Sequence, residues 1–283
     1  MKSFCIKTNN VKIQDYLLNN LANIDLEDIY FIKKEFKIYQ NIIVHYKGQY
    51  YDDFISALSS IITNCILIYY EPILIVNSIK LNYFYFDDYE KNLIEKICYS
   101  HIIQDEDDTL KYRNIEIYLE VVRYLNENKS MILDGFVNFR LRNYLATIDD
   151  IVDFSVNKYV IEKEYNEFID LLKTYVNSKE SSIDIVHIIY NNGESILLDK
   201  NKNIIKKDES IFNSKYLSDI TFSSNDYTLN SLLSLLPKRI EIHIIGNEDE
   251  FISTLKLVFS TRVFICTDCS LCNLYRVSNK TLQ

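Results

Sequence analysis

The stretch Asn177-Ser-Lys-Glu-Ser-Ser-Ile-Asp-Ile-Val-His-Ile-Ile-Tyr190 marks the point where the character of the chain changes. Before it, residues 111–179 repeat apolar side chains at helical spacing, with no proline and a single glycine. After it, residues 183–190 are typical of a β-strand, Asn191-Asn-Gly193 is a hairpin signal, and residues 195–199 form a returning strand. The sequence therefore predicts an α+β protein.

Three regions are expected. Residues 1–110 form a small mixed part with buried helices, residues 111–180 form a long helical middle, and residues 181–283 form an α/β module. Within these regions the patterns favour strands at 1–8, at 183–190, at 195–199, at 239–245, at 262–266 and twice within 29–47, and helices at 11–23, from 51 onward, at 89–103, at 162–176, at 229–236 and at 248–258. Residues 126–130 are expected to break the helical middle, residues 105–108 form an acidic run, and residues 200–214 form a polar stretch.

Composition excludes some classes of function. The glycines Gly48, Gly135, Gly193 and Gly246 stand alone, whereas the phosphate-binding loops of nucleotide-binding proteins need several glycines close together. The net charge is −9 and the pI is about 5.1. Nucleic-acid binding depends on neutralising phosphates, so this acidic balance makes nucleic acid an unexpected partner.

One segment is apolar enough to require a membrane test. Residues 56–79 carry a single charge, Glu71, which is followed by Pro72. A carboxylate at the centre of a bilayer costs about 2.5–3.5 kcal/mol. We therefore expect two buried stretches that meet at Pro72, and no membrane span. The first ten residues lack the apolar core of a secretory signal, so a cytoplasmic location is expected.

The sharpest chemical feature is a cluster of three cysteines in the sequence Cys266-Thr-Asp-Cys269-Ser-Leu-Cys272. It follows a predicted strand, where a turn could fold three thiols around one centre. Soft thiolates suit Zn²⁺ and, as a second choice, an iron–sulfur cluster. A structural zinc site needs four ligands. The fourth could come from His243 on the neighbouring predicted strand, from His187, from a remote cysteine, from water or from another subunit.

Two other interpretations of the cluster stay open. The thiols could form a redox or partner-binding group, or they could be reduced and serve only in packing. The pair Cys269 and Cys272 has the C-x-x-C spacing of thiol oxidoreductases, but that interpretation requires the start of a helix, of which the polar Thr267-Asp268 gives no clear signal. The isolated Cys5, Cys65 and Cys98 are expected to pack as small apolar side chains.

A second group of polar residues lies in Asp134-Gly-Phe-Val-Asn138-Phe-Arg140-Leu-Arg142. On one continuous helix Asp134, Asn138 and Arg142 would share a face. Arginine suits carboxylates and phosphates, so Arg140 and Arg142 could contact an anion or a nucleic acid. We favour the alternative, an internal network of salt bridges that ties Asp134, Asp149 or Asp150 to these arginines.

No catalytic set can be assembled from the spacing of the four histidines, the serines and the carboxylates. We therefore expect a binding or regulatory protein, acting on an unknown protein partner, rather than an enzyme. An iron–sulfur or thiol redox protein is one alternative, and a binder of nucleic acid or phosphate ligands through Arg140 and Arg142 is another.

The chain also resembles a known family. The residues that carry the resemblance are Leu133-Asp-Gly-Phe-Val-Asn-Phe-Arg-Leu-Arg-Asn-Tyr144, the segment 156–172, Leu236-Pro-Lys-Arg-Ile-Glu-Ile-His243 and Val263-Phe-Ile-Cys-Thr-Asp-Cys-Ser-Leu-Cys272. They resemble the YtxC-like family, described as sporulation proteins of endospore-forming Firmicutes. The resemblance covers roughly residues 40–275 and implies a biological setting, without an activity or site residues to carry over.

The nucleic-acid interpretation makes a prediction about Arg140. If Arg140 contacts phosphates, the chain binds DNA or RNA in a salt-sensitive way and Arg140→Ala weakens that binding, because each lost cation removes one phosphate contact. Filter binding at two salt concentrations measures it. With the internal network that we favour, wild type and Arg140→Ala retain nucleic acid equally, and a difference between them would contradict our preference.

Overall fold

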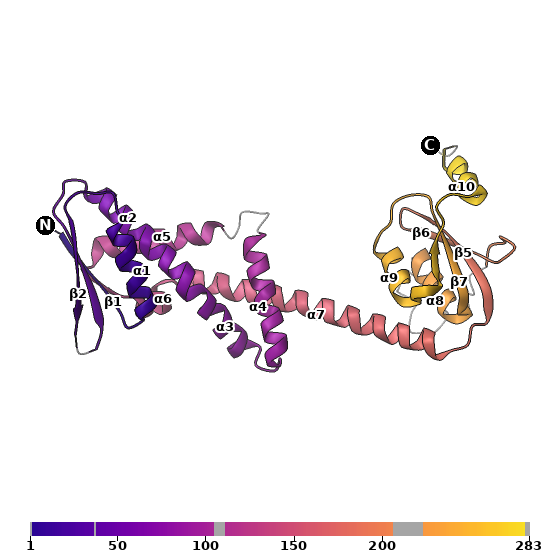
Figure 1. Cartoon of the computed structure of the whole chain (residues 1–283), viewed down its shortest axis with the longest axis horizontal. Coiled ribbons are helices and arrows are strands. Elements are labelled where there is room, and N and C mark those ends of the chain that lie inside the picture. Colours follow the sequence, from indigo (N-terminus) through magenta and orange to yellow (C-terminus); the bar gives the residue numbers. More distant parts are fainter. Residues whose placement is uncertain (1, 37, 105–110, 206–222, 281–283) are drawn as a thin grey trace. The chain divides into compact units, whose positions relative to one another are not determined.

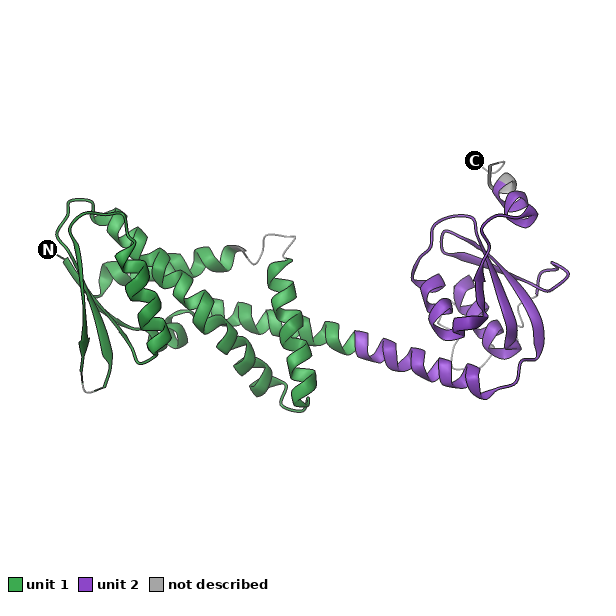
Figure 2. Ribbon diagram, viewed as in Figure 1, with its two compact units in different colours: residues 1–161 green, residues 162–283 purple. Residues whose placement is uncertain are grey.

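The computed structural model describes residues 2–36, 38–104, 111–205 and 223–280, so the acidic run 105–108 and most of the polar stretch 200–214 lie outside the described residues. The chain forms two compact units, residues 1–161 and 162–283 (Figure 2). Each unit combines a mixed sheet with helices (Figure 1), so the predicted α+β class is confirmed.

The sheet of the first unit has the strand order β2-β3-β1-β4. Its strands are β1 (Lys2–Thr8), β2 (Ile29–Glu35), β3 (Gln40–Tyr46) and β4 (Ser130–Ile132). β1 is antiparallel to β3 and parallel to β4. Alternation along β1 buries Phe4 and Ile6 in the core and leaves Cys5 half-buried on the other face. The short strand β4 is not among the predicted elements, because three residues leave no pattern that stands out from the helical sequence around them.

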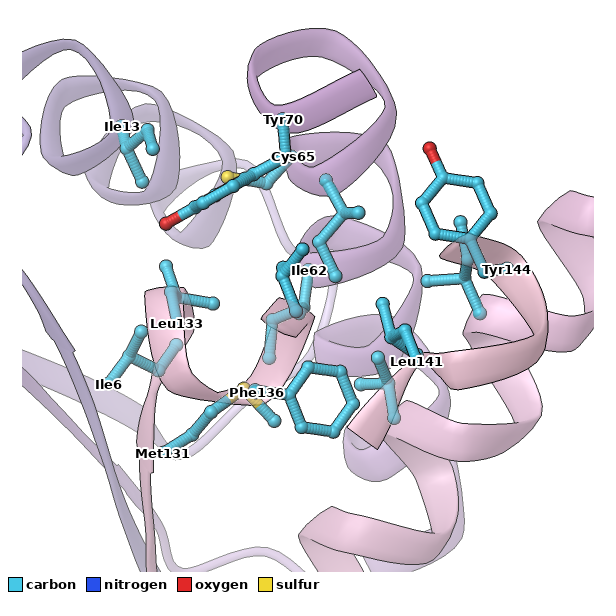
Figure 3. Close-up of a cluster of buried hydrophobic side chains, with 14 of the residues drawn as sticks. Ile6, Ile13, Ile62, Cys65, Tyr70, Met131, Leu133, Phe136, Leu141 and Tyr144 are labelled. Carbon is cyan, nitrogen blue, oxygen red and sulfur yellow. The ribbon is translucent and has the colours of Figure 1, made fainter. Parts of the chain in front are cut away.

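Helices complete this unit. They are α1 (Val11–Ala22), α2 (Tyr51–Cys65), α3 (Glu71–Asn82), α4 (Asp88–Ile103), α5 (Lys111–Glu127), α6 (Leu133–Arg140) and the first half of α7 (Arg142–Ser178), with a π-helical segment η1 (Ile66–Tyr70) between α2 and α3. The side chain of Asn10 accepts hydrogen bonds from the first turn of α1, and a capping box of Asp87 and Glu90 begins α4. Figure 3 shows part of the core that these elements enclose, where Ile6, Ile62 and Phe136 converge.

The apolar segment is a continuous helical run, Tyr51–Asn82, which by length and composition alone could cross a membrane. Of its most apolar window, 44% is buried inside the fold. Pro72 lies in the first turn of α3, where its missing N–H is not needed. The two expected stretches are therefore joined by the π-helical segment η1, and the chain stays helical through Pro72.

The single charge of this run is paired inside the unit. Glu71 is 7% exposed, and its Oε2 lies 3.0 Å from Nε of Arg113 on α5. The hydroxyl of Tyr144 on α7 donates to the same oxygen at 3.0 Å. Burial, together with the neighbouring carboxylate, raises the pKa of Tyr144 above its ordinary value, so the hydroxyl stays a donor. Glu71 thus joins three helices through one carboxylate.

The sheet of the second unit has the order β6-β5-β7-β8. Its elements are β5 (Ile183–Asn191), β6 (Glu194–Leu198), α8 (Ser224–Leu235), β7 (Pro237–Ile244), α9 (Glu250–Phe259), a short 3₁₀ turn η3 (Ser260–Arg262), β8 (Val263–Ile265) and α10 (Ser270–Lys280). β5, β7 and β8 run parallel, and β6 is antiparallel to β5. Asn192 and Gly193 take positive φ angles of 45° and 90°, as the predicted hairpin requires.

Helix α7 contributes to the cores of both units. Ile148, Val152 and Val156 are buried in the first unit, and Ile169 and Val176 in the second. Thirty-seven residues form this helix without a break. The sequence predicted a separate helix over residues 162–176. The apolar residues of α7 do not form one continuous stripe, because they pack into two different cores.

The buried pair Glu71–Arg113 yields a stability prediction. Arg113→Ala leaves a buried carboxylate without its cation, so we expect the free energy of unfolding to fall by about 3–5 kcal/mol. Urea unfolding followed by circular dichroism measures the loss. The matched control is Arg123→Ala on the same helix, whose ion pair with Glu120 involves an arginine side chain that is 65% exposed. Its loss should stay within about 0.5 kcal/mol, and equal losses for the two variants would contradict the prediction.

Candidate metal centre

Strand β7 places His243 on the face of the sheet that the core does not use. Ile240 and Ile242 are fully buried against the helices of the second unit. Because side chains alternate along a strand, Glu241 and His243 point to the opposite face. His243 is nevertheless only 3% exposed, so other residues cover it there.

The cysteine segment provides this cover. The backbone N–H of Cys266, directly after β8, donates to the carbonyl of Ile242 at 2.9 Å, which extends the ladder and brings Cys266 beside His243. A turn follows, closed by an ion pair of 3.2 Å between Asp268 and Arg276. Helix α10 then begins at Ser270, so Cys269 directly precedes the helix and Cys272 lies in its first turn. Figure 1 shows α10 near the C-terminus, and it packs on β7.

Four potential ligand atoms meet at this point. The sulfur atoms of Cys269 and Cys272 both lie 3.4 Å from Nδ1 of His243. The sulfur atom of Cys272 lies 3.7 Å from that of Cys269 and 3.8 Å from that of Cys266. One ligand atom from each of the four residues lies within 4.8 Å of all the others. The predicted candidate set of Cys266, Cys269, Cys272 and His243 is thus brought together.

These separations match the edges of a zinc tetrahedron. With Zn–S bonds of about 2.3 Å and a Zn–N bond of about 2.0 Å, two sulfurs lie about 3.8 Å apart and sulfur and nitrogen about 3.5 Å apart. The distances of 3.7, 3.8 and 3.4 Å agree with this geometry. The group could therefore hold a metal ion such as Zn²⁺.

The protonation of the ligands depends on their surroundings. Burial lowers the pKa of His243, which favours the neutral imidazole that a metal needs. Burial and the adjacent thiols raise the pKa of Cys266 to about 12. Burial opposes ionisation of Cys269 as well, but hydrogen bonds led by the backbone N–H of Cys272 hold its pKa below the ordinary value.

The helix at this position was not predicted. A thiol oxidoreductase pair at Cys269 and Cys272 requires the start of a helix. Because α10 begins at Ser270, the structure meets this requirement. Positive potential at a helix N-terminus stabilises a nearby thiolate. The apolar side of α10 is anchored by Leu271, which is 6% exposed and packs with Ile189 and Leu198.

The other cysteines belong to the first unit. Cys65 and Cys98 are fully buried, and burial raises the pKa of Cys65 to about 12. Burial also raises the pKa of Cys98 and of the half-buried Cys5. These environments suit small side chains that pack and do not react.

The second polar group is arranged differently from the expectation. Helix α6 ends at Arg140 and α7 begins at Arg142, so the three residues expected on one helical face are divided between two helices. Asp134 accepts a hydrogen bond of 2.7 Å from Tyr70, and Asn138 donates to the backbone of Asp134 at 2.8 Å.

Neither arginine forms an ion pair within the described ranges. The guanidinium of Arg140 lies 5.9 Å from the centre of the Tyr124 ring, and both arginines are exposed. Asp149 accepts instead from Ser78 at 2.6 Å. The expected network of salt bridges is therefore replaced by hydrogen bonds to neutral groups.

The fold and the site define an α+β protein whose C-terminal sheet carries a Cys₃His group. The chain belongs to the YtxC-like family, which residues 56–264 match, and this confirms the resemblance seen in the sequence. It is 26% identical over 191 residues, 65% of this chain and 67% of the relative, to the "Uncharacterized protein YtxC" of Bacillus subtilis (strain 168). No solved structure matches the chain. The family match includes His243 and ends before Cys266.

Proposed function

We propose that the second unit is a zinc-binding module in which Cys266, Cys269, Cys272 and His243 hold one Zn²⁺. The observation that carries the proposal is the set of separations between the four ligand atoms, 3.4 to 3.8 Å, which fits a single tetrahedral ion. A packing role alone would not require a buried imidazole nitrogen to face two thiols.

The role proposed for the ion is structural. Four protein ligands close the coordination sphere and leave no position for water or substrate, unlike a catalytic zinc site. Three thiolates and a neutral imidazole give the zinc centre a net charge of −1. The N-terminus of α10 lies beside it and favours that charge. The ion would fix α10 to the end of β7.

A thiol redox centre is the second candidate. It is favoured by one observation, the 3.7 Å between the sulfur atoms of Cys269 and Cys272 at the start of a helix. An iron–sulfur cluster is less well supported, because the four ligand atoms enclose the volume of one ion. Both candidates differ from zinc in measurable ways.

Metal analysis of anaerobically purified protein tests the proposal. We expect about one zinc per chain, a colourless preparation, and loss of the metal in His243→Ala and in Cys269→Ser. Cobalt in place of zinc should give the absorption of a tetrahedral ion with a thiolate charge-transfer band. Cys5→Ser, a half-buried cysteine of the first unit, is the matched control and should keep the metal. A clearly substoichiometric zinc content would overturn the proposal, and visible absorption of the purified protein would favour iron and sulfur.

For the cellular role we propose a cytoplasmic, sporulation-associated protein that binds a protein partner and is not an enzyme. Thiols grouped around one centre suit a reducing compartment, and the net charge of −9 disfavours nucleic acid. The paired Glu71 suits a core helix better than a membrane span. Affinity purification from sporulating cells after crosslinking tests the partner, and recovery of the chain alone would contradict it.

A further inference from the structure

The imidazole of His243 has a partner at each of its two nitrogens. Nδ1 faces the sulfur atoms of Cys269 and Cys272 at 3.4 Å. Nε2 lies 3.1 Å from Nδ1 of His187 on β5. The zinc site proposed above uses Nδ1 alone, so the contact at Nε2 needs its own explanation.

The register of two parallel strands creates this second contact. His187 on β5 pairs with Glu241 on β7, and Ile189 pairs with His243. Alternation therefore places His187, Glu241 and His243 on one face of the sheet, with His187 diagonal to His243. His187 is 9% exposed and His243 3%.

The carboxylate of Glu241 and the guanidinium of Arg239 lie next to this pair of histidines. Oε2 of Glu241 lies 3.3 Å from Nδ1 of His187, and its Oε1 lies 2.8 Å from Nη2 of Arg239. The guanidinium of Arg239 lies 4.2 Å from the centre of the Phe264 ring on β8. Nδ1 of His187 thus faces both His243 and Glu241, and it can either accept a proton from His243 or donate one to Glu241; the shorter separation, 3.1 Å against 3.3 Å, favours His243.

A neutral imidazole carries one proton. When Nδ1 of His243 binds a metal, the proton must be on Nε2, and a buried N–H needs an acceptor. The nearest acceptor is Nδ1 of His187. We propose that His187 is the positioning partner of His243, with its Nδ1 accepting the Nε2–H of His243 and so directing Nδ1 of His243 toward the three sulfur atoms. This inference rests on the proposed zinc site.

A second metal ion is the competing explanation, because His187, Glu241 and His243 could also hold one. Two observations favour the hydrogen bond. The separation of 3.1 Å is an ordinary hydrogen-bond length. A second ion would require His243 to bind metals through both nitrogens and to lose both protons. The second ion is therefore an outcome that the experiment has to separate.

The test compares zinc affinities, measured on the full chain by competition with a coloured chelator. Loss of an outer partner of a metal-bound histidine costs about 10- to 100-fold in affinity. We expect a loss of this size for His187→Phe, which keeps the ring and removes the acceptor. His187→Gln, whose amide oxygen can accept the proton, should recover most of it. The matched control is His101→Phe in the first unit, which should leave the affinity unchanged.

A spectroscopic readout separates positioning from general stability. In ¹⁵N-histidine spectra of the zinc-loaded chain, His243 should carry its proton on Nε2, and that proton should exchange with water faster in His187→Phe. Equal zinc affinity of wild type and His187→Phe would overturn this inference alone. Two metals in wild type and one in His187→Phe would replace it with a second site. A wild-type chain without zinc would overturn the proposed function, and this inference with it.

Discussion

Strand β7 contributes side chains to both faces of its sheet, and this alternation constrains where its polar residues lie. Its isoleucines close the core of the second unit, and the residues between them, Glu241 and His243, must therefore face the other side. A buried imidazole on that side is tolerable only with partners for its nitrogens. The cysteine segment supplies partners for one nitrogen and β5 supplies the partner for the other. The position of the candidate site thus follows from the packing of the core.

The two units meet the same physical problem, a polar group among apolar side chains, in different ways. In the first unit, the carboxylate of Glu71 is matched by Arg113 and Tyr144, which come from two other helices. In the second unit, burial lowers the pKa of His243, and its Nδ1 faces two thiols. A buried charge needs a countercharge, whereas a buried neutral ligand is ready for a cation. Only the second arrangement offers a place for a metal.

Much of this arrangement is readable from the sequence. The alternation around His243 predicts a strand beside the cysteine cluster, and this is why His243 could be named as a fourth ligand. The contact of His187 with His243 could not be predicted, because it depends on the register of β5 and β7, which periodicity does not specify.

Other features left weaker signals. Helix α10 starts in a polar turn, and its few apolar residues pack on only a small cluster. The break at Leu141 separates Asp134 from Arg142, although the apolar spacing continues through it, and the apolar spacing therefore predicted one helix where two exist. Local spacing could not distinguish a kink between packed helices from a continuous helix.

The ligand positions also have a consequence for the unfolded chain. A metal that joins His243 to Cys266 closes a loop of about 24 residues, which contains α9 and β8. If the bonds to the ion behave as a cross-link, closing such a loop removes unfolded-state entropy equivalent to roughly 3.4 kcal/mol at 25 °C. The ion would then act as a reversible cross-link. The last third of the second unit would be the part of the chain whose stability depends most on the supply of metal.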